Sequence, residues 1–100
     1  MEIKINIQST TAEAQLTGRL DTAASSQFAT DMQPLMDNAD KAITLDCARL
    51  EFISSSGLRL FLSLRKQTIA KGGKVIITNM NPEVKQVFAI TGFTALFEFK

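Results

Sequence analysis

Histidine, tryptophan and tyrosine are absent from this chain of 100 residues, and cysteine occurs once, as Cys47. The lack of histidine excludes Ser-His-Asp and Cys-His catalysis and removes the commonest ligand of zinc and non-haem iron sites. A single cysteine cannot form an intrachain disulfide or a thiolate metal cluster. We therefore expect no metal and no cofactor, and we interpret Cys47, on the apolar side of a predicted strand, as a buried structural thiol.

An excess of charge of one sign is also missing, since eleven basic residues face ten acidic ones and leave a net charge of +1. This balance argues against direct nucleic-acid binding, which rewards a strongly basic surface. The first residues lack the pattern of a signal peptide, and no run approaches the ~20 apolar residues that cross a bilayer. We expect a cytoplasmic protein without membrane insertion, folded as a single domain over residues 1–100, because chains divide into domains only beyond ~250 residues.

The pattern of apolar residues predicts strands and helices in alternation. Apolar and polar residues alternate along residues 2–18, which predicts an antiparallel hairpin. The elements expected after it are a helix capped by Asp21 or Thr22 that kinks or ends at Pro34, a strand over 42–47 with an apolar connection over 50–53, a helix from about 56 to 71, a strand over 74–78, a helix starting at Asn81-Pro82, and a last strand over 96–99.

This order predicts an α/β fold. Strands separated by helices pair in parallel through right-handed crossovers. We expect a mixed sheet of about four to five strands, with an N-terminal antiparallel hairpin and three to four helices. The broad apolar face predicted for the helix over 56–71 consists of Leu58, Phe61, Leu62, Leu64 and Ile69.

The run Ser54-Ser55-Ser56-Gly57, at the start of that helix, is the first candidate site. One interpretation is a helix cap, because serine accepts hydrogen bonds from the free amides of the first turn. The other is a phosphorylation site, because a helix N-terminus favours negative charge and a phosphoserine adds about −1.5 to −2 charges. Both hold together if Ser56 caps the helix while Ser55 points outward.

Asp21 and Arg19 form a second candidate site, in the segment Leu16–Asp21. A lone carboxylate is a poor catalytic acid or metal ligand, so we interpret Asp21 as a cap of the first helix. It would lie beside the serine turn if the second and third strands are neighbours. Arg19 would then be placed to contact a partner or a phosphate.

Four segments resemble one known family, the STAS domain, and within it the bacterial anti-sigma factor antagonists. They are LTGRLD (16–21), LDCARLEFISSSGLR (45–59), GGKVIITN (72–79) and NPEVKQVFAITGFTALFEF (81–99), and together they cover nearly the whole chain. The most specific parts are the Ser-Ser-Gly-Leu turn and the C-terminal segment that ends in Leu-Phe. The resemblance implies the STAS fold.

The resemblance also implies a function. Such antagonists bind an anti-sigma factor that is also a serine kinase, and this binding releases a sigma factor. The kinase phosphorylates a serine in the turn of the antagonist, which ends the binding. A phosphatase of the PP2C type removes the phosphate. The family pattern Asp-Ser-Ser-Gly maps the phosphoacceptor to Ser55, with Ser54 in the place of the aspartate, and Ser54 and Ser56 are alternative acceptors. We expect a monomer or weak dimer. The expected partner contacts are Asp21, Arg19, Ser54, Ser55, Ser56, Gly57, Arg59 and Ser63.

Two alternatives stay open at this point. STAS domains also serve as subunits of membrane transporters and of stress-signalling assemblies, which keeps the fold and changes the partner. A small enzyme with Ser55 as nucleophile would instead need a lysine or carboxylate within about 3 Å of the hydroxyl.

Overall fold

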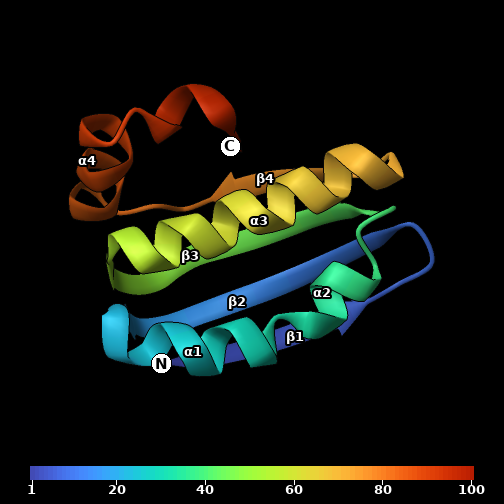
Figure 1. Cartoon of the computed structure of the whole chain (residues 1–100), viewed down its shortest axis with the longest axis horizontal. Helices are drawn as coiled ribbons and strands as arrows, with labels where there is room; N and C mark the ends of the chain where they lie inside the picture. Colours follow the sequence, from blue (N-terminus) through green and yellow to red (C-terminus); the bar gives the residue numbers. More distant parts are fainter.

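The computed structural model describes all 100 residues and contains five strands and four α-helices (Figure 1). In chain order the elements are β1 (Glu2–Ile7), β2 (Thr11–Leu20), α1 (Thr22–Asp31), α2 (Gln33–Asp37), β3 (Ala42–Ile53), α3 (Ser55–Lys71), β4 (Lys74–Thr78), α4 (Pro82–Ile90), the 3₁₀ turn η1 (Phe93–Leu96) and β5 (Glu98–Phe99).

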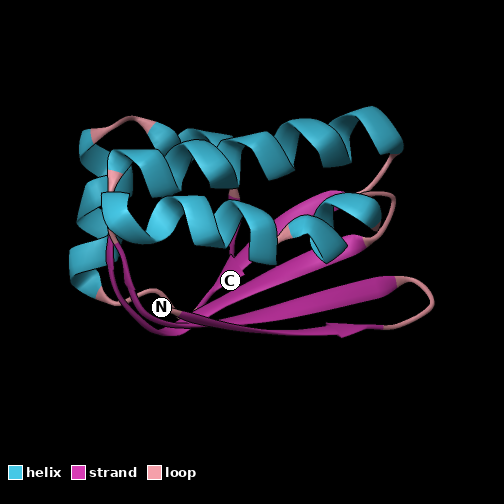
Figure 2. Ribbon diagram, turned by 60° about the horizontal axis from the view of Figure 1, so that its bottom comes forward, coloured by secondary structure: helices cyan, strands magenta, loops and turns pink.

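The five strands form one mixed sheet in the order β1-β2-β3-β4-β5. The β1–β2 pair is antiparallel, and the other three pairs are parallel. This confirms the predicted α/β fold with an N-terminal hairpin. Helices α1, α2 and α3 cover one face of the sheet and leave the other face open to solvent (Figure 2).

The core lies between this sheet and its helices, and three phenylalanine rings connect its parts. The ring of Phe61 in α3 lies 6.1 Å from the ring of Phe28 in α1 and 6.1 Å from that of Phe88 in α4. All three side chains are buried, together with inward-facing residues of β2 and β3. The helices are thereby fixed on the sheet by one continuous apolar layer.

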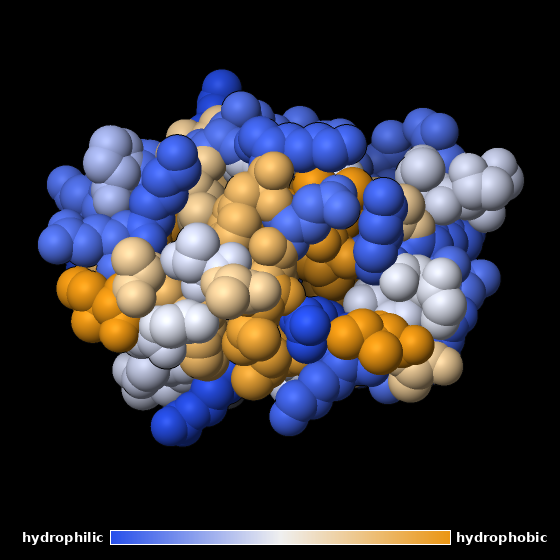
Figure 3. All heavy atoms as spheres, turned by 90° about the horizontal axis from the view of Figure 1, so that it is seen from above, coloured by the Kyte–Doolittle hydropathy of each residue, from blue (hydrophilic) through white to orange (hydrophobic).

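The C-terminal segment packs at the β5 edge of the sheet. The ring of Phe88 contacts the rings of Phe97 and Phe99 edge-on, at 5.8 and 5.7 Å. Both of these C-terminal rings stay partly exposed, and apolar atoms gather in the middle of this edge (Figure 3). The last strand is shorter than the predicted 96–99, because η1 takes Leu96 into a helical turn.

Strand β3 is longer than predicted, and the expected connection over 50–53 is wrong. The strand continues to Ile53 because it stays paired with β2 as far as Leu20. Two register shifts each place one extra β3 residue in the ladder, and these bulges interrupt the alternation of buried and exposed residues. In the sequence, an interrupted alternation looks like the end of a strand.

The helix predicted after Asp21 does end before Pro34. Helix α1 stops at Asp31, and the short α2 begins at Gln33 with the proline in its first turn, where no amide is needed.

The predicted apolar face of α3 is wrong at one position. Ile69 is 61% exposed, and Thr68 is buried in its place, with its hydroxyl donating to the Arg65 carbonyl at 2.8 Å.

Candidate functional site

Two helix N-termini lie side by side at the carboxyl ends of β2 and β3. Asp21 caps α1, and its carboxylate accepts a hydrogen bond from the Ala24 amide at 2.9 Å. Leu20 pairs with Ile53, and the Ser54 amide donates to the Leu20 carbonyl at 2.8 Å. The predicted cap role of Asp21 and its place beside the serine turn are therefore confirmed.

Ser54, not Ser56, caps α3. Its Oγ accepts from the Gly57 amide at 3.1 Å, and its own backbone is extended, with φ −87° and ψ 169°. The prediction that Ser56 caps the helix is wrong because Ser55 and Ser56 already lie within the first helical turn. Ser55 is exposed, whereas Ser54 and Ser56 are half-buried. Of the three hydroxyl groups, that of Ser55 is the most accessible to an approaching protein.

Gly57 allows α3 to approach the two strands closely. A Cβ at this position would lie 2.7 Å from Leu20 Cγ and 3.0 Å from Ile53 Cγ1, closer than side chains pack. Gly57 is buried, so it positions the serine turn from beneath and offers little surface to a partner.

The outer face of α3 continues the surface that begins at Ser55. Arg59, Ser63 and Lys66 are exposed along it, and the Ser63 hydroxyl donates to the Arg59 carbonyl at 3.0 Å. The helix contains no acidic residue. Ser55 therefore lies at the positive end of a helix dipole, on a face that carries only positive charges.

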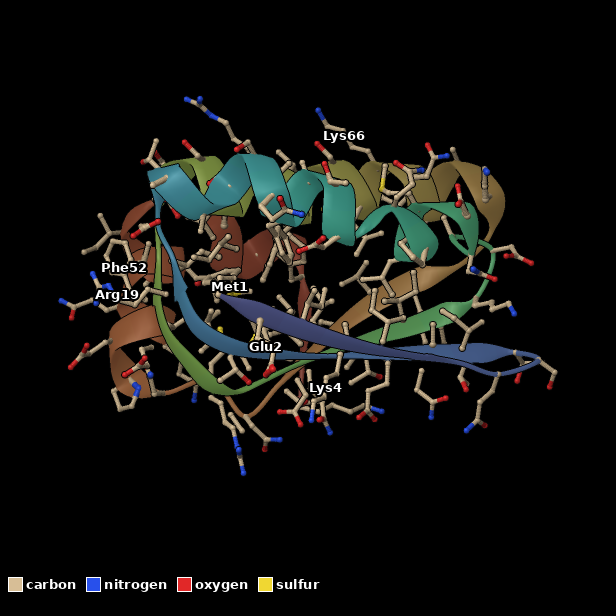
Figure 4. The ribbon with its side chains drawn as sticks, turned by 90° about the horizontal axis from the view of Figure 1, so that it is seen from below. Met1, Glu2, Lys4, Arg19, Phe52 and Lys66 are labelled. Carbon is tan, nitrogen blue, oxygen red and sulfur yellow. The ribbon has the colours of Figure 1, made fainter.

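Arg19 lies on the same end of the molecule, where its guanidinium stacks on an aromatic ring. The Cζ atom is 4.5 Å from the centroid of Phe52, and Figure 4 shows the two side chains together at the end of the sheet. The sequence pattern predicts Arg19 at this site but gives no sign of Phe52, which it places in a connection after the third strand.

The surface grooves lie away from Ser55. The largest, about 380 Å³, is a polar groove on the open face of the sheet. Its lining residues are Glu2, Lys4, Gln15, Leu16, Thr17, Asp46, Ala48 and Arg49. The surface around Ser55 thus suits contact with another protein better than enclosure of a small molecule.

Cys47 lies in the core, as predicted, and its pKa is raised to about 12. Burial disfavours the thiolate most, and the neighbouring Asp46 carboxylate adds repulsion. The cysteine, aspartate and glutamate side chains do not gather in groups of three or more that would hold a metal ion. No helix has the length and apolar content required to span a membrane.

Comparisons with known proteins agree with this geometry. The family model described as the STAS domain matches residues 2–100. Among curated proteins, BtrV of Bordetella bronchiseptica, which carries the name anti-sigma factor antagonist, is 33% identical over 84 residues, covering 84% of this chain and 72% of BtrV.

The solved structures show the same fold. The anti-sigma factor antagonist SpoIIAA in its unphosphorylated form is 26% identical, with a TM-score of 0.81 over 99% of this chain and 88% of that one. The phosphorylated form of SpoIIAA from Bacillus, 24% identical in its alignment, has a TM-score of 0.71 over 99% and 91%.

Proposed function

This chain belongs to the STAS domain family, with relatives among the anti-sigma factor antagonists, and on that premise we propose that it binds an anti-sigma factor with serine kinase activity, thereby releasing a sigma factor. Phosphorylation of Ser55 ends the binding, and a PP2C-type phosphatase restores it. The protein acts in the cytoplasm by partner switching and regulates transcription without catalysing a reaction of its own.

The exposed hydroxyl of Ser55 is the observation that supports this proposal. It lies one residue after the cap of α3 and forms no hydrogen bond with a lysine or a carboxylate that would act as its base. A nucleophilic serine needs such a base, whereas a phosphoacceptor needs only access to a kinase. That SpoIIAA occurs in both unphosphorylated and phosphorylated forms supports the same role.

A phosphate on Ser55 would change the surface more than the fold. The cap bond between Ser54 and the Gly57 amide does not involve the Ser55 side chain, so it survives the modification. The phosphate would bring about −1.5 to −2 charges to a face that now presents Arg59 and Lys66. A partner that fits this positive face would then meet a negative group at the end where the face begins.

The test is incubation with a serine kinase encoded beside this gene and ATP, followed by mass-spectrometric mapping of the modified residue. We expect one phosphate on Ser55, lost in Ser55→Ala and kept in the matched controls Ser54→Ala and Ser56→Ala. Ser55→Asp should weaken binding to that kinase in a titration. Equal affinity of Ser55→Asp and wild type, or modification elsewhere, would refute the proposed switch.

A further inference from the structure

The stacked pair of Arg19 and Phe52 is the least explained feature of this end of the molecule. The two residues are direct neighbours across β2 and β3, and both side chains reach the surface, with Arg19 exposed and Phe52 half-buried. Phe52 comes three residues before Ser55, and Arg19 comes two before the α1 cap. The pair therefore adjoins the proposed docking surface, by which we mean Ser55 and the outer face of α3 with Arg59, Ser63 and Lys66.

A β-bulge brings the pair together. Gly18 pairs with Leu50 and Arg19 pairs with Phe52, so Glu51 is an extra residue on β3. Gly18 has φ +102°, a conformation that favours glycine. The bulge turns Phe52 toward Arg19 while Leu50 and Ile53 remain in the core. Bulges of this kind commonly redirect a side chain next to a functional site.

Stability alone gives little reason for this arrangement. An exposed cation–π contact contributes only about 0.5–1 kcal/mol, less than the roughly 1.5–3 kcal/mol gained by fully burying a large apolar side chain. Arg19 also has no carboxylate partner, since the one ion pair of the molecule joins Lys74 to Glu98. Its charge and the exposed part of Phe52 are both available to a second protein. Tryptophan, tyrosine and arginine are the side chains most enriched at binding hot spots, and phenylalanine shares the large apolar ring of the first two.

We infer that the Arg19–Phe52 pair is the anchor by which the anti-sigma protein docks, with an aliphatic side chain of that protein on Phe52 and a carboxylate beside it on Arg19. This inference rests on the proposed function and extends it. The interface then has two parts. The anchor supplies affinity whatever the state of the serine, and Ser55, on the adjoining helix, supplies the switch.

The experiment is a titration of the co-encoded anti-sigma kinase, by calorimetry, with four variants at the pair and two matched controls. Phe52→Ala and Arg19→Glu should each raise Kd tenfold or more, as loss of a hot spot does. Phe52→Leu and Arg19→Lys, which keep an apolar group or the charge, should raise it less. The first control is Lys4→Glu, the same charge reversal on the open face of the sheet. The second is Phe93→Ala, which removes a half-buried phenylalanine of η1, in the C-terminal segment. Both controls should bind like wild type.

The outcomes separate this inference from the proposed function. If wild type binds and is phosphorylated while Phe52→Ala and Arg19→Glu bind equally well, the anchor is refuted and the function stands. If wild type neither binds nor is phosphorylated, the proposed function fails, and the inference fails with it. Thermal unfolding shows whether each variant is folded. If Phe52→Ala does not fold, the inference is tested by comparing the Kd of Arg19→Glu with that of its control Lys4→Glu.

Discussion

Asp21 and Ser54 occupy equivalent positions in two neighbouring helices but differ in charge. Each accepts a hydrogen bond from the third residue along its helix, at 2.9 and 3.1 Å. A carboxylate cap also offsets the positive end of its helix, whereas a serine cap satisfies the amide and leaves that charge in place. The N-terminus of α3 is thus the less compensated of the two, and a phosphate on Ser55 would be its nearest anion.

Cys47 yields a pH prediction at the same scale. Its pKa lies at about 12 in the folded chain against 9.0 for a free thiol, because burial and the Asp46 charge disfavour the thiolate. Between pH 9 and pH 12 the thiol of the unfolded chain loses its proton, whereas the thiol of the folded chain keeps it. The neutral buried thiol therefore contributes its full stability below pH 9. This contribution falls as the pH rises toward 12.

We expect the free energy of unfolding of wild type, relative to Cys47→Ala, to fall above pH 9 by up to about 1.4 kcal/mol per pH unit. Urea titrations of both proteins at several pH values measure this difference. All other titrating groups are the same in the two proteins, so their contributions cancel when the value for Cys47→Ala is subtracted from that for wild type. A constant difference between the two proteins from pH 8 to 11 would contradict the buried thiol.

At the scale of elements, the sequence predicts best what local chemistry controls. Helix starts are an example, since residue type and position limit the cap of α1 to Asp21 or Thr22 and identify Asn81 as the cap of α4. The length of β3 is not predictable in this way, because its second half depends on pairing with β2 through two bulges. The same long-range register hides the contact of Arg19 with Phe52 from the sequence. Ser55 and Arg19 themselves are candidate site residues that the sequence already proposes.

Gly72 and Gly73 end α3 for two different physical reasons. Gly72 has φ +84° and open space where a Cβ would lie, so it supplies a left-handed backbone. A Cβ on Gly73 would instead overlap the backbone carbonyl oxygens of Ala39 and Lys41. The first glycine is therefore required for conformation, and the second for the close approach of two chain segments.

Gly73→Ala should consequently destabilise the protein more than Gly72→Ala. We expect losses of about 3 kcal/mol or more for Gly73→Ala, because backbone must move, and about 1 kcal/mol for Gly72→Ala, from the strained φ. Urea denaturation of both variants gives the two values. Equal losses would mean that the segment before β3 yields easily, against the packing described above.

At the scale of the whole molecule, charge divides along the chain. Residues 1–54 carry eight acidic and four basic side chains, whereas residues 55–100 carry two acidic and seven basic ones. Because the strands lie in the sheet in chain order, this division in sequence becomes a division in space, with an acidic β1 side and a basic β5 side (Figure 1). The net charge of +1 conceals it. Helix α3 is the first element of the basic side and carries the proposed docking face.

This polarity predicts how the protein meets its partner. A surface charge at the rim of an interface acts mainly on the association rate, and salt screens that effect. Arg59→Glu, on the exposed face of α3, should lower the association rate constant with the co-encoded kinase about tenfold at low salt. The difference from the wild-type rate constant should shrink as salt is raised.

Lys85→Glu changes the net charge equally but lies on α4, outside the proposed face, and should have a smaller effect. Stopped-flow measurements at several salt concentrations distinguish the two. Equal effects of both variants would show that overall charge, not the face of α3, steers the encounter.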